Sequence, residues 1–444
     1  MSRLFGTDGV RGVVGKELTK ELAYKLGVAG ARVLTTSENT KPKILIGCDT
    51  RISCDMLCKA LVCGIRKEGA NAVVLGVIPT PAVAVLTRLY KADAAVMISA
   101  SHNPYEFNGI KFFDKNGYKL SDKIEDEIQA VVELLPDAQE TDVLLENQGT
   151  ASADYINYLK STTNVNLENL NIVIDCANGA SSKLAPVIFK DLGANVTVIN
   201  NKPDGTNINK DCGSTHINAL QQEVIKKGAD IGFAFDGDAD RVLSVDENGQ
   251  LIDGDKILAI IGNYMKHQNT LDKDTIVVTV MSNLGFDVMA KQNGINVVKT
   301  KVGDRYVLEE MLKNGYVIGG EQSGHVILLK YNTTGDGMLT AIKLLEVLKT
   351  TGKKASGLAS IMDVYPQVLR NARVKNENKY KYLEDEVIKN ICDELEKEFK
   401  NEGRVLIRPS GTEPLIRVMI EGKDEAYITK KAEMLAKVVE ERLG

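Results

Sequence analysis

Three aspartates stand at alternate positions in the segment DGDADR. On a flat strand Asp236, Asp238 and Asp240 would spread over roughly 13 Å at about 3.3 Å per residue, so the backbone must curl to bring them together. Gly237 would permit such a curl. Three carboxylates repel one another unless a hard divalent cation lies between them, and Mg²⁺ is the usual cation beside phosphate. The segment therefore predicts a magnesium site, with Arg241 placed to bind phosphoryl oxygens.

An EF-hand calcium loop is the sharpest alternative, because Glu247 falls at the twelfth position counted from Asp236. The sixth position is Arg241 rather than glycine, and the flanking residues predict strands instead of helices. These two features exclude the EF-hand. An acidic surface turn without an ion is a simpler interpretation, and the segment alone leaves it open.

The segment ISASHNP follows an apolar stretch and ends in Asn-Pro, a pair that stops regular structure. It predicts a turn exposing Ser101 and His102, where the serine could act as a nucleophile. A serine that only caps a helix is the simpler interpretation. The four histidines indicate no catalytic triad, so the serine would need a nearby base or an attached phosphate. Ser99 lies two positions away, and spacing does not choose between the two serines.

The glycine-flanked loop GGEQSGH carries Glu321, Ser323 and His325. These side chains suit hydrogen bonds to the hydroxyls or amine of a sugar, and the glycines would let the backbone approach a ligand. A structural turn is the competing interpretation.

A second polar loop, RPSGTEP, lies near the C-terminus. Backbone amides, hydroxyls and arginine forks together are typical of a phosphate cradle. The contributing residues are Arg408, Ser410, Gly411, Thr412 and Arg417. The loop is not a P-loop, because GxxxxGK[ST] is absent. A plain surface turn remains possible from the residues alone.

Two further basic residues lie in segments whose pattern indicates a function less strongly than the loops above. Arg11 lies in the turn-rich opening FGTDGVRG, and Lys111 follows the Ser101 segment. Lys111 could be a packed surface lysine or a proton shuttle, and spacing does not separate these roles.

One order of elements occurs three times along the chain. Each copy opens with a β-branched strand, continues through a helical stretch to a Gly-x-Asn strand, and ends in a strand that runs into a polar loop. The opening strands lie at 43–51, 171–179 and 275–283; the Gly-x-Asn strands begin at Gly69, Gly193 and Gly294; the last strands and loops lie at 94–104, 230–241 and 316–325. Because ligands bind beyond the carboxyl ends of strands in α/β sheets, these three loops are the expected site.

Strands alternating with helix-length segments predict βαβ units, and Asn-Gly turns within 111–120 and 243–252 add antiparallel hairpins. Beyond them, helices at 379–400 and 424–443 are expected around strands at 404–408 and 415–422. The fold class is therefore α/β: three repeated α/β domains with mixed sheets, plus a smaller α+β C-terminal domain. The expected domains are 1–152, 153–252, 253–366 and 367–444.

The composition excludes some classes of binding partner. The 444 residues carry a net charge of -5 and a pI near 5.7, without the basic excess that nucleic-acid binding requires. The start, MSRLFGTDGV, has no apolar leader, and no apolar run is long enough to cross a bilayer. Seven cysteines without a CxxC pair favour reduced thiols. We expect a cytoplasmic protein that binds neither nucleic acid nor membrane.

Five motifs stand in one order on this chain: FGTDGVRG, ISASHNP, DGDADR, GEQSGH and RPSGTEP. Together they closely resemble the α-D-phosphohexomutase superfamily over essentially the whole length. VGDRYV (302–307) and NINKDCGSTH (207–216) are similar to the branch that acts on glucosamine phosphates. The resemblance implies four domains in a heart-shaped molecule around a central cleft, closed by a mobile last domain.

The resemblance also implies roles for the residues. Ser101 matches the family's phosphoserine, whose phosphate joins the three aspartates as a ligand of one Mg²⁺. Arg11, Lys111 and Arg241 match basic residues around the phosphoryl group, with Lys111 as proton shuttle. Glu321 and Ser323 match the family's sugar-contacting loop, and His325 matches the histidine beside it. The family's phosphate-binding loop is matched by Arg408, Ser410, Gly411, Thr412 and Arg417.

The implied activity interconverts glucosamine 6-phosphate and glucosamine 1-phosphate through a 1,6-bisphosphate, supplying UDP-N-acetylglucosamine and hence cell-wall precursors. Glucosamine or glucose 1,6-bisphosphate would serve as activator, and the chain would be a monomer or homodimer. Alternatives are a phosphomannomutase or phosphoglucomutase, a metal-dependent sugar-phosphate phosphatase using Ser101, and a sugar-phosphate sensor without catalysis. Neither the phosphatase nor the sensor explains the motifs as well: a phosphatase needs no second anion cradle, and a sensor needs no nucleophile.

Overall fold

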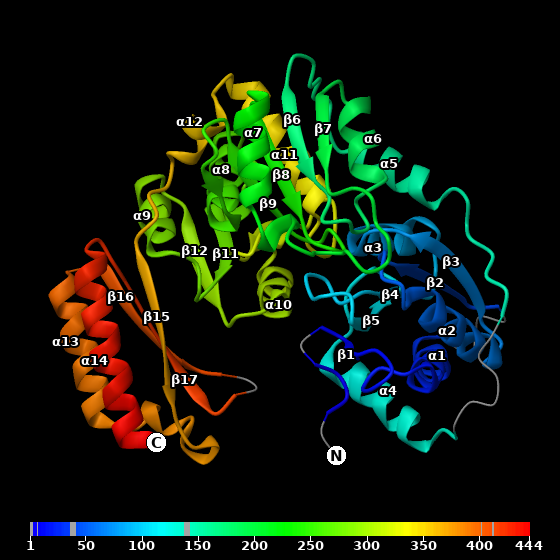
Figure 1. Ribbon diagram of the computed structural model, residues 1–444, viewed down its shortest axis with the longest axis horizontal. Helices are drawn as coiled ribbons and strands as arrows, with labels where there is room; N and C mark the ends of the chain where they lie inside the picture. The colour runs from blue at the N-terminus through cyan, green and yellow to red at the C-terminus, as the bar shows by residue number, and fades with distance from the viewer. Residues whose placement is uncertain (1–2, 7, 36–40, 137–142, 401, 411–412) are drawn as a thin grey trace. The chain divides into compact units, whose positions relative to one another are not determined.

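The computed structural model describes the chain except for residues 1–2, 7, 36–40, 137–142, 401 and 411–412. The described chain divides into two compact units (Figure 1). The first contains residues 1–281 and 293–361, and the second contains residues 282–292 and 362–444.

The first sheet of the larger unit has the order β1-β5-β4-β2-β3. Its strands are β1 (Val10–Val13), β2 (Lys43–Cys48), β3 (Asn71–Val77), β4 (Ala94–Ile98) and β5 (Phe107–Asp114). Its helices are α1 (Lys20–Leu34), α2 (Cys54–Lys67), α3 (Thr80–Leu89) and α4 (Asp122–Leu134), followed by α5 (Ala151–Ser161). β2 pairs with β3 and β4 in parallel, whereas β5 is antiparallel to β4 and β1. The sheet is mixed, as predicted.

The second sheet repeats this arrangement in the order β10-β9-β8-β6-β7. Its strands are β6 (Asn171–Asp175), β7 (Asn195–Ile199), β8 (Ile231–Phe235), β9 (Val242–Asp246) and β10 (Leu251–Ile252). Its helices are α6 (Leu184–Asp191), the short turn η1 (Gly213–Thr215) and α7 (Asn218–Lys227).

The third sheet has the order β12-β11-β13-β14. Its strands are β11 (Thr275–Thr279), β12 (Asn296–Thr300), β13 (Ile318–Gly320) and β14 (Val326–Leu328). The helices are α8 (Gly254–His267), η2 (Asp272–Asp274), α10 (Asp304–Asn314), α11 (Gly337–Thr351) and α12 (Ala355–Ala359).

The threefold pattern found in the sequence is confirmed by these pairings. β3, β7 and β12 each begin at the asparagine of Gly-x-Asn. In every sheet the strand that precedes a polar loop (β4, β8 or β13) is parallel to the opening strand and antiparallel to the strand that follows it. The three polar loops therefore leave equivalent strands at the same edge of equivalent sheets.

The two predicted hairpins are also present. Gly117 and Gly249 have positive φ values of 78–79° in the turns, where an L side chain would be strained. Beyond them, Phe113 pairs with Lys119, and β9 pairs with β10. The first hairpin is important for the site because it carries Lys111 on one arm and Lys119 on the other.

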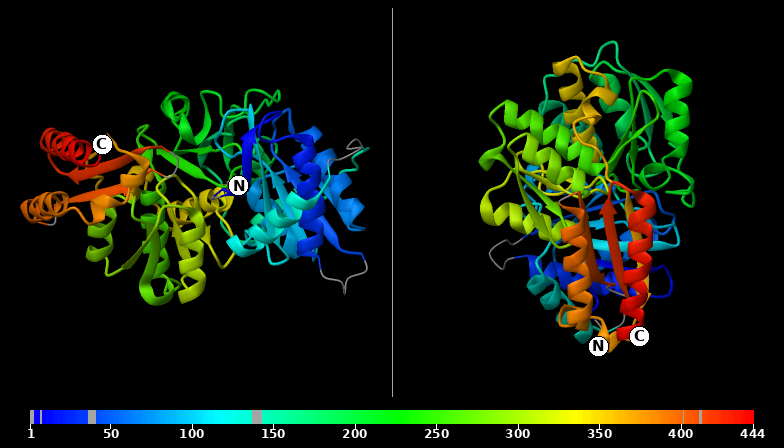
Figure 2. Two further views of the ribbon diagram at one scale, coloured as in Figure 1. Left: turned by 90° about the horizontal axis from the view of Figure 1, so that it is seen from below. Right: turned by 90° about the vertical axis from the view of Figure 1, so that its left-hand side faces the viewer.

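The smaller unit is a three-stranded antiparallel sheet in the order β15-β17-β16. Its elements are α9 (Leu284–Gln292), β15 (Gln367–Arg373), η3 (Asn376–Asn378), η4 (Lys381–Leu383), α13 (Glu386–Phe399), β16 (Gly403–Pro409), β17 (Leu415–Gly422) and α14 (Glu425–Leu443). α13 packs on β16, and α14 packs on β15 and β17 (Figure 2). Val368 and Ala372 of β15 are buried beneath the helices, whereas Leu369 between them is exposed.

Two predictions for this unit need correction. β15 was not expected, because QVLRNAR mixes polar residues with few β-branched ones. The helix expected at 379–400 begins only at Glu386, where the Asp385 carboxylate caps the backbone N–H groups of Val387 and Ile388. Short 3₁₀ turns occupy the preceding residues.

No helix in the described part of the chain is both long and apolar enough to span a membrane. All seven cysteines carry free thiols.

Candidate active site

The loop after β8 brings the three aspartates together. Asp236, Asp238 and Asp240 are buried, and one carboxylate oxygen from each lies within 4.8 Å of the others. The curl occurs at Ala239, which has a left-handed φ of 55°, and not at Gly237 as the sequence suggested. Gly237 serves a different purpose: a Cβ there would lie 2.6 Å from the Ser101 carbonyl oxygen. The glycine lets the aspartate loop and the serine loop touch.

Residues from all three α/β domains hold the aspartate loop in place. The Thr80 backbone N–H donates to the Asp238 carbonyl at 3.0 Å, and the Gly337 N–H donates to the Ala239 carbonyl at 3.0 Å. The Ala180 N–H donates to the Gly237 carbonyl at 2.8 Å. These bonds satisfy backbone groups that burial would otherwise leave unpaired. The loop is therefore held by its whole unit and not by its own strand alone.

The electrostatics of the aspartates indicate a cation site. Burial, followed by the charges of Asp240 and Asp238, raises the pKa of Asp236 well above its usual range. Among the described residues, no donor reaches the buried Oδ1 atoms of Asp238 and Asp240. Buried carboxylate oxygens without partners are costly, and a hard cation satisfies them. The donor set, all oxygen and clustered, fits a divalent metal.

Ser101 lies directly at this cluster. Its hydroxyl donates a hydrogen bond of 2.6 Å to Asp236 Oδ2, and its backbone has a left-handed φ of 53°. The Ser99 hydroxyl instead donates to Asp49 at 2.7 Å and accepts from the Ser101 N–H at 2.9 Å. Of these two serines, Ser101 is the one whose hydroxyl reaches the cluster of Asp236, Asp238 and Asp240. The geometry thus favours Ser101 over Ser99, a choice that spacing left open.

Lys111 is fully enclosed on β5, where its ammonium lies 2.9 Å from both Asp238 and Asp8. Burial opposes the charged form, but the carboxylates of Asp238 and Asp8 outweigh it and raise the pKa of Lys111. The lysine is therefore held protonated in this arrangement. It can donate a proton or a hydrogen bond more readily than it can accept a proton.

Arg11 and Arg241 create a positive field beside Ser101. Arg11 donates to Asp8 at 2.5 Å, and Arg241 Nε lies 3.9 Å from Asp240. Burial, with further effects from the charges of Arg241 and Arg11, lowers the pKa of His102 to about 4. Burial opposes a charge of either sign, but the two guanidinium charges favour an anion, such as a phosphoryl group on the neighbouring serine.

His325 is buried beside the aspartates. The Gly335 backbone N–H donates to His325 Nε2 at 3.0 Å, so that nitrogen accepts and Nδ1 carries the proton. Nδ1 lies 3.5 Å from Asp240 Oδ2. This histidine orients the Asp240 carboxylate, as outer partners do at metal sites.

The other residues of the GGEQSGH loop are more accessible. Glu321 is partly buried, and its Oε1 accepts from the Gly303 N–H at 3.0 Å. Ser323 is exposed at the tip between β13 and β14. The loop backbone is fixed by the Gly254 N–H, which donates to the Gln322 carbonyl. A partly buried, oriented carboxylate next to an exposed hydroxyl can bind a polar ligand such as a sugar.

Sequence reasoning missed three charged residues that complete the site: Asp8, Lys119 and Asp304. Lys119 lies 2.6 Å from Asp8 and 2.5 Å from Asp304. Asp304 also lies 3.6 Å from His325 Nε2. All three occur in segments that the sequence marked as motifs or hairpins, but only the fold shows that they form a chain of alternating charge between the first and third sheets.

Replacing Lys119 by methionine is expected to destabilise the protein by about 3 kcal/mol, because the partly buried carboxylates of Asp8 and Asp304 lose their shared partner. The free energy of unfolding in urea measures this effect. Lys160→Met is the control, since Lys160 and Asp191 form an exposed pair whose loss should cost less than about 1 kcal/mol. Equal losses in the two variants would contradict the expectation.

The smaller unit brings together two of the predicted phosphate-binding residues. Arg408 of β16 lies directly opposite Arg417 of β17, and Ser410 is buried at the start of the connecting loop. Like charges facing each other are unfavourable without an anion. Burial, then the charge of Arg417, lowers the pKa of Arg408. Of the other predicted members of this cradle, Gly411 and Thr412 lie outside the described residues.

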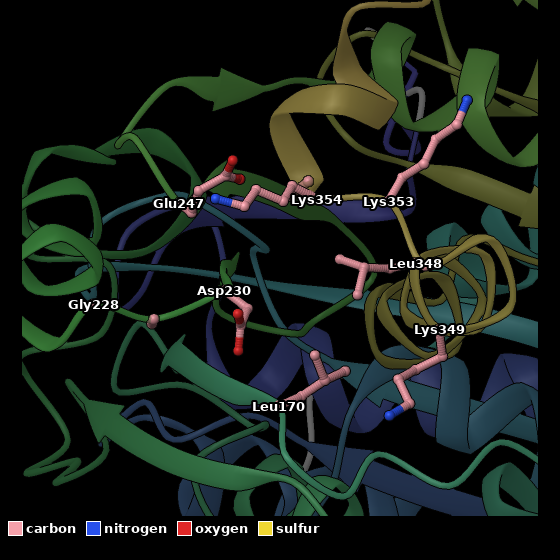
Figure 3. A pocket seen from close by; sticks show the side chains of 11 residues that line it. Leu170, Gly228, Asp230, Glu247, Leu348, Lys349, Lys353 and Lys354 are labelled. Carbon is pink, nitrogen blue, oxygen red and sulfur yellow. The ribbon is translucent and has the colours of Figure 1, made fainter.

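A separate cavity of about 440 Å³ lies in the larger unit (Figure 3). Its lining includes Asp230, Glu247, Lys349 and Lys354 but none of the residues of the candidate active site. Glu247 accepts from Ser356, and Lys349 donates to a backbone carbonyl. Glu247 and Lys349 thus have partners within the protein, and the cavity adds no residue to the candidate active site.

Comparison with known proteins identifies the family of this chain. Four models of the phosphoglucomutase/phosphomannomutase family match in succession: α/β/α domain I at residues 2–137, domain II at 153–249, domain III at 253–365 and the C-terminal domain at 369–438. A solved member of that family from Burkholderia thailandensis has a TM-score of 0.80 at 23% identity, covering 99% of this chain and 97% of that one. The expected four-domain α/β architecture is confirmed.

Curated relatives identify a narrower group within this family. A phosphoglucosamine mutase of Acetivibrio thermocellus is 64% identical over 450 residues, and one of Ruminiclostridium cellulolyticum is 62% identical over 449 residues. Each match covers the whole of both chains. With its serine, aspartate and arginine loops in place, this chain belongs to the phosphoglucosamine mutases, within the phosphoglucomutase/phosphomannomutase family.

Proposed function

We propose that this isomerase interconverts glucosamine 6-phosphate and glucosamine 1-phosphate through a phosphorylated Ser101. The phosphoserine transfers its phosphoryl group to O1 of glucosamine 6-phosphate, breaking the Ser101 Oγ–P bond and forming the O1–P bond. The 1,6-bisphosphate then turns over, and the phosphoryl group on O6 returns to Ser101. The observation that carries this proposal is the Ser101 hydroxyl, 2.6 Å from one of three clustered aspartates.

Asp236, Asp238 and Asp240 would hold one Mg²⁺, with an oxygen of the serine phosphate as a further ligand. The ion would supply positive charge to the transferring phosphoryl group, whose oxygens gather negative charge in the transition state. The clustered carboxylate oxygens and the partnerless Oδ1 atoms support this assignment.

Protein side chains supply the rest of the charge and the protons. Arg241 and Arg11 flank the serine and would bind phosphoryl oxygens, and Lys111 would donate a proton to the departing oxygen and recover it from the attacking hydroxyl. His325 keeps Asp240 oriented. Glu321 and Ser323 would bind the sugar, with the carboxylate of Glu321 suited to the substrate's ammonium group.

The bisphosphate carries two phosphates and only one of them reacts at Ser101 at a time, so a second site must hold the phosphate that is not reacting. Arg408, Ser410, Gly411, Thr412 and Arg417 are proposed for this role. The facing arginines, Arg408 and Arg417, support it, because an anion relieves their repulsion. Glucosamine or glucose 1,6-bisphosphate would load Ser101 and restore any bisphosphate lost to solvent.

The seven free thiols support a reducing compartment, and we place the enzyme in the cytoplasm. Its product would supply the synthesis of UDP-N-acetylglucosamine.

A mutase assay with Mg²⁺ and a catalytic amount of glucose 1,6-bisphosphate tests the proposal. Catalytic efficiency on glucosamine 6-phosphate should exceed that on glucose or mannose 6-phosphate by about tenfold or more, equivalent to about 1.4 kcal/mol of transition-state binding. A reversed preference would indicate a phosphoglucomutase or phosphomannomutase. Stoichiometric release of inorganic phosphate without isomerisation would indicate a phosphatase.

A further inference from the structure

We propose that Asp49, Arg51 and Ser99 act as positioning residues for Ser101, and we call them the serine clamp. The inference rests on the proposed role of Ser101 as the phosphorylated residue. Among the described residues, the bonds of these three side chains go to one another, to the Cys54 thiol and to the backbone of the serine loop, and none goes to the aspartate cluster.

Arg51 holds the loop through its carbonyl groups. The Asp49 and Arg51 side chains are entirely buried and form an ion pair of 2.9 Å. Arg51 Nη2 donates to the carbonyls of Ser101 and Asn103, each at 2.9 Å. Nη1 donates to the carbonyls of Pro104 and Phe107. One guanidinium thus gathers four carbonyls from a seven-residue segment, 101–107.

Ser99 holds the same residue from its amide side. Its hydroxyl accepts from the Ser101 N–H at 2.9 Å and donates to Asp49 at 2.7 Å. Both backbone polar groups of Ser101 are therefore bound, directly or indirectly, to the Asp49–Arg51 pair. Asn209, from the second sheet's domain, supports the Ser101 carbonyl with a further bond of 2.9 Å.

A clamp is needed because the Ser101 backbone is not in a relaxed conformation. A left-handed φ of 53° is unfavourable for a non-glycine residue, and such a conformation persists only where the surroundings determine it. This conformation directs the hydroxyl toward Asp236. If the loop relaxed, the hydroxyl would leave its place beside the aspartates.

The chemistry of arginine explains why a buried charge is kept here. A buried ion pair often stabilises a fold no more than well-packed apolar residues would. The Asp49–Arg51 pair therefore indicates a role in fixing the geometry of the serine loop more than a role in stability. A planar fork can bind four carbonyls in fixed directions, whereas a lysine ammonium has three donors and no fixed plane. The clamp would thereby keep the reacting oxygen in line for phosphoryl transfer, where a shift of about 1 Å can cost about 100-fold in rate.

The test compares Ser99→Ala and Arg51→Lys with matched controls elsewhere in the same unit. Ser244→Ala removes another buried hydroxyl, which donates to the Gly232 carbonyl at 2.8 Å. Arg88→Lys removes another arginine that binds carbonyls, those of Ala84 and Tyr331. Each variant is measured for thermal unfolding, for kcat and KM with glucosamine 6-phosphate, and for phosphate on Ser101 by intact mass after incubation with glucose 1,6-bisphosphate.

We expect kcat to fall roughly tenfold in Ser99→Ala and about 100-fold in Arg51→Lys, with KM within about twofold of the wild type. Loading of Ser101 should slow in parallel. The two control variants should keep kcat within about twofold of the wild type, even where their unfolding temperature falls as much as that of the clamp variants. If Arg51→Lys does not fold, Ser99→Ala, which removes a single oxygen atom, decides the question.

An unchanged kcat in Ser99→Ala, or a loss that the matched control reproduces, would overturn the clamp. Failure of the proposed function has a different signature, since the wild type itself would then show no mutase turnover or no phosphate on Ser101. A wild type that prefers another hexose phosphate corrects only the substrate, and the same variants are then compared on that substrate.

Discussion

Replacing Ser101 by alanine is expected to lower mutase turnover by about 10⁴-fold or more and to abolish phosphate loading from glucose 1,6-bisphosphate. The hydroxyl beside Asp236 is the proposed site of phosphorylation, and alanine leaves no nucleophile at position 101. Stability should change little, by about 1–2 kcal/mol, because the substitution removes one hydrogen bond and keeps the backbone. Steady-state kinetics and intact mass together measure the effect.

Ser99→Ala serves as the control for this prediction as well, because it removes a neighbouring buried hydroxyl without removing the proposed nucleophile. It should retain measurable turnover and accept one phosphate. Peptide mapping must then place that phosphate on Ser101. Phosphate on Ser99, or full turnover by Ser101→Ala, would show that the assignment of the reacting serine is wrong.

Asp236→Asn is expected to move stability and activity in opposite directions. Without metal, three buried carboxylates repel one another, and burial with the charges of Asp240 and Asp238 keeps the pKa of Asp236 raised. For an acid whose folded-state pKa lies above its unfolded value, ionisation of the unfolded chain favours unfolding at neutral pH. Asparagine removes that penalty, so the variant should be more stable in EDTA by about 1–3 kcal/mol. With Mg²⁺, its kcat should be lower by about 10²–10³-fold, since a ligand is lost.

Urea unfolding in EDTA and kinetics in Mg²⁺ measure the two halves of this prediction. Asp175→Asn is the matched control: Asp175 is equally buried in the same domain but accepts from the N–H groups of Ala177 and Gly213 and from Asn200. That variant should be less stable, because an amide nitrogen would face donors. A destabilised Asp236→Asn in EDTA would mean that its carboxylate is a structural group and not a metal ligand.

The order of elements was readable from the sequence because its signals are local. β-branched strands, Gly-x-Asn starts and Asn-Gly turns depend on residues close together in the chain, and the sheets followed them. β15 has no such signal, and its pairing with β17 depends on residues about 50 positions apart. The start of α13 was misplaced for a related reason, since its true cap, Asp385, lies within a polar stretch that itself resembles a helix.

Within the site, residue types indicated the chemistry but not the contacts. Asp236, Asp238 and Asp240 predicted a metal centre from their spacing, yet the curl occurs at Ala239. Gly237 is needed because the Ser101 carbonyl and the side chains of Asn209 and Ile208 lie against it. Arg51 looked like an ordinary residue after a strand. Its role as a clamp depends on a loop about 50 residues away, and no local pattern announces it.

What the sequence by itself determined is the set of reactive groups and the strand ends that carry them, because the periodicity of apolar residues and the chemistry of each side chain are properties of short segments. Only the tertiary structure decided which groups meet: Ser101 rather than Ser99 at Asp236, Lys119 between Asp8 and Asp304, and Arg51 beneath the serine loop. These contacts join residues that the chain separates widely. They depend on how three sheets pack, and packing is set by the whole core and not by any one segment.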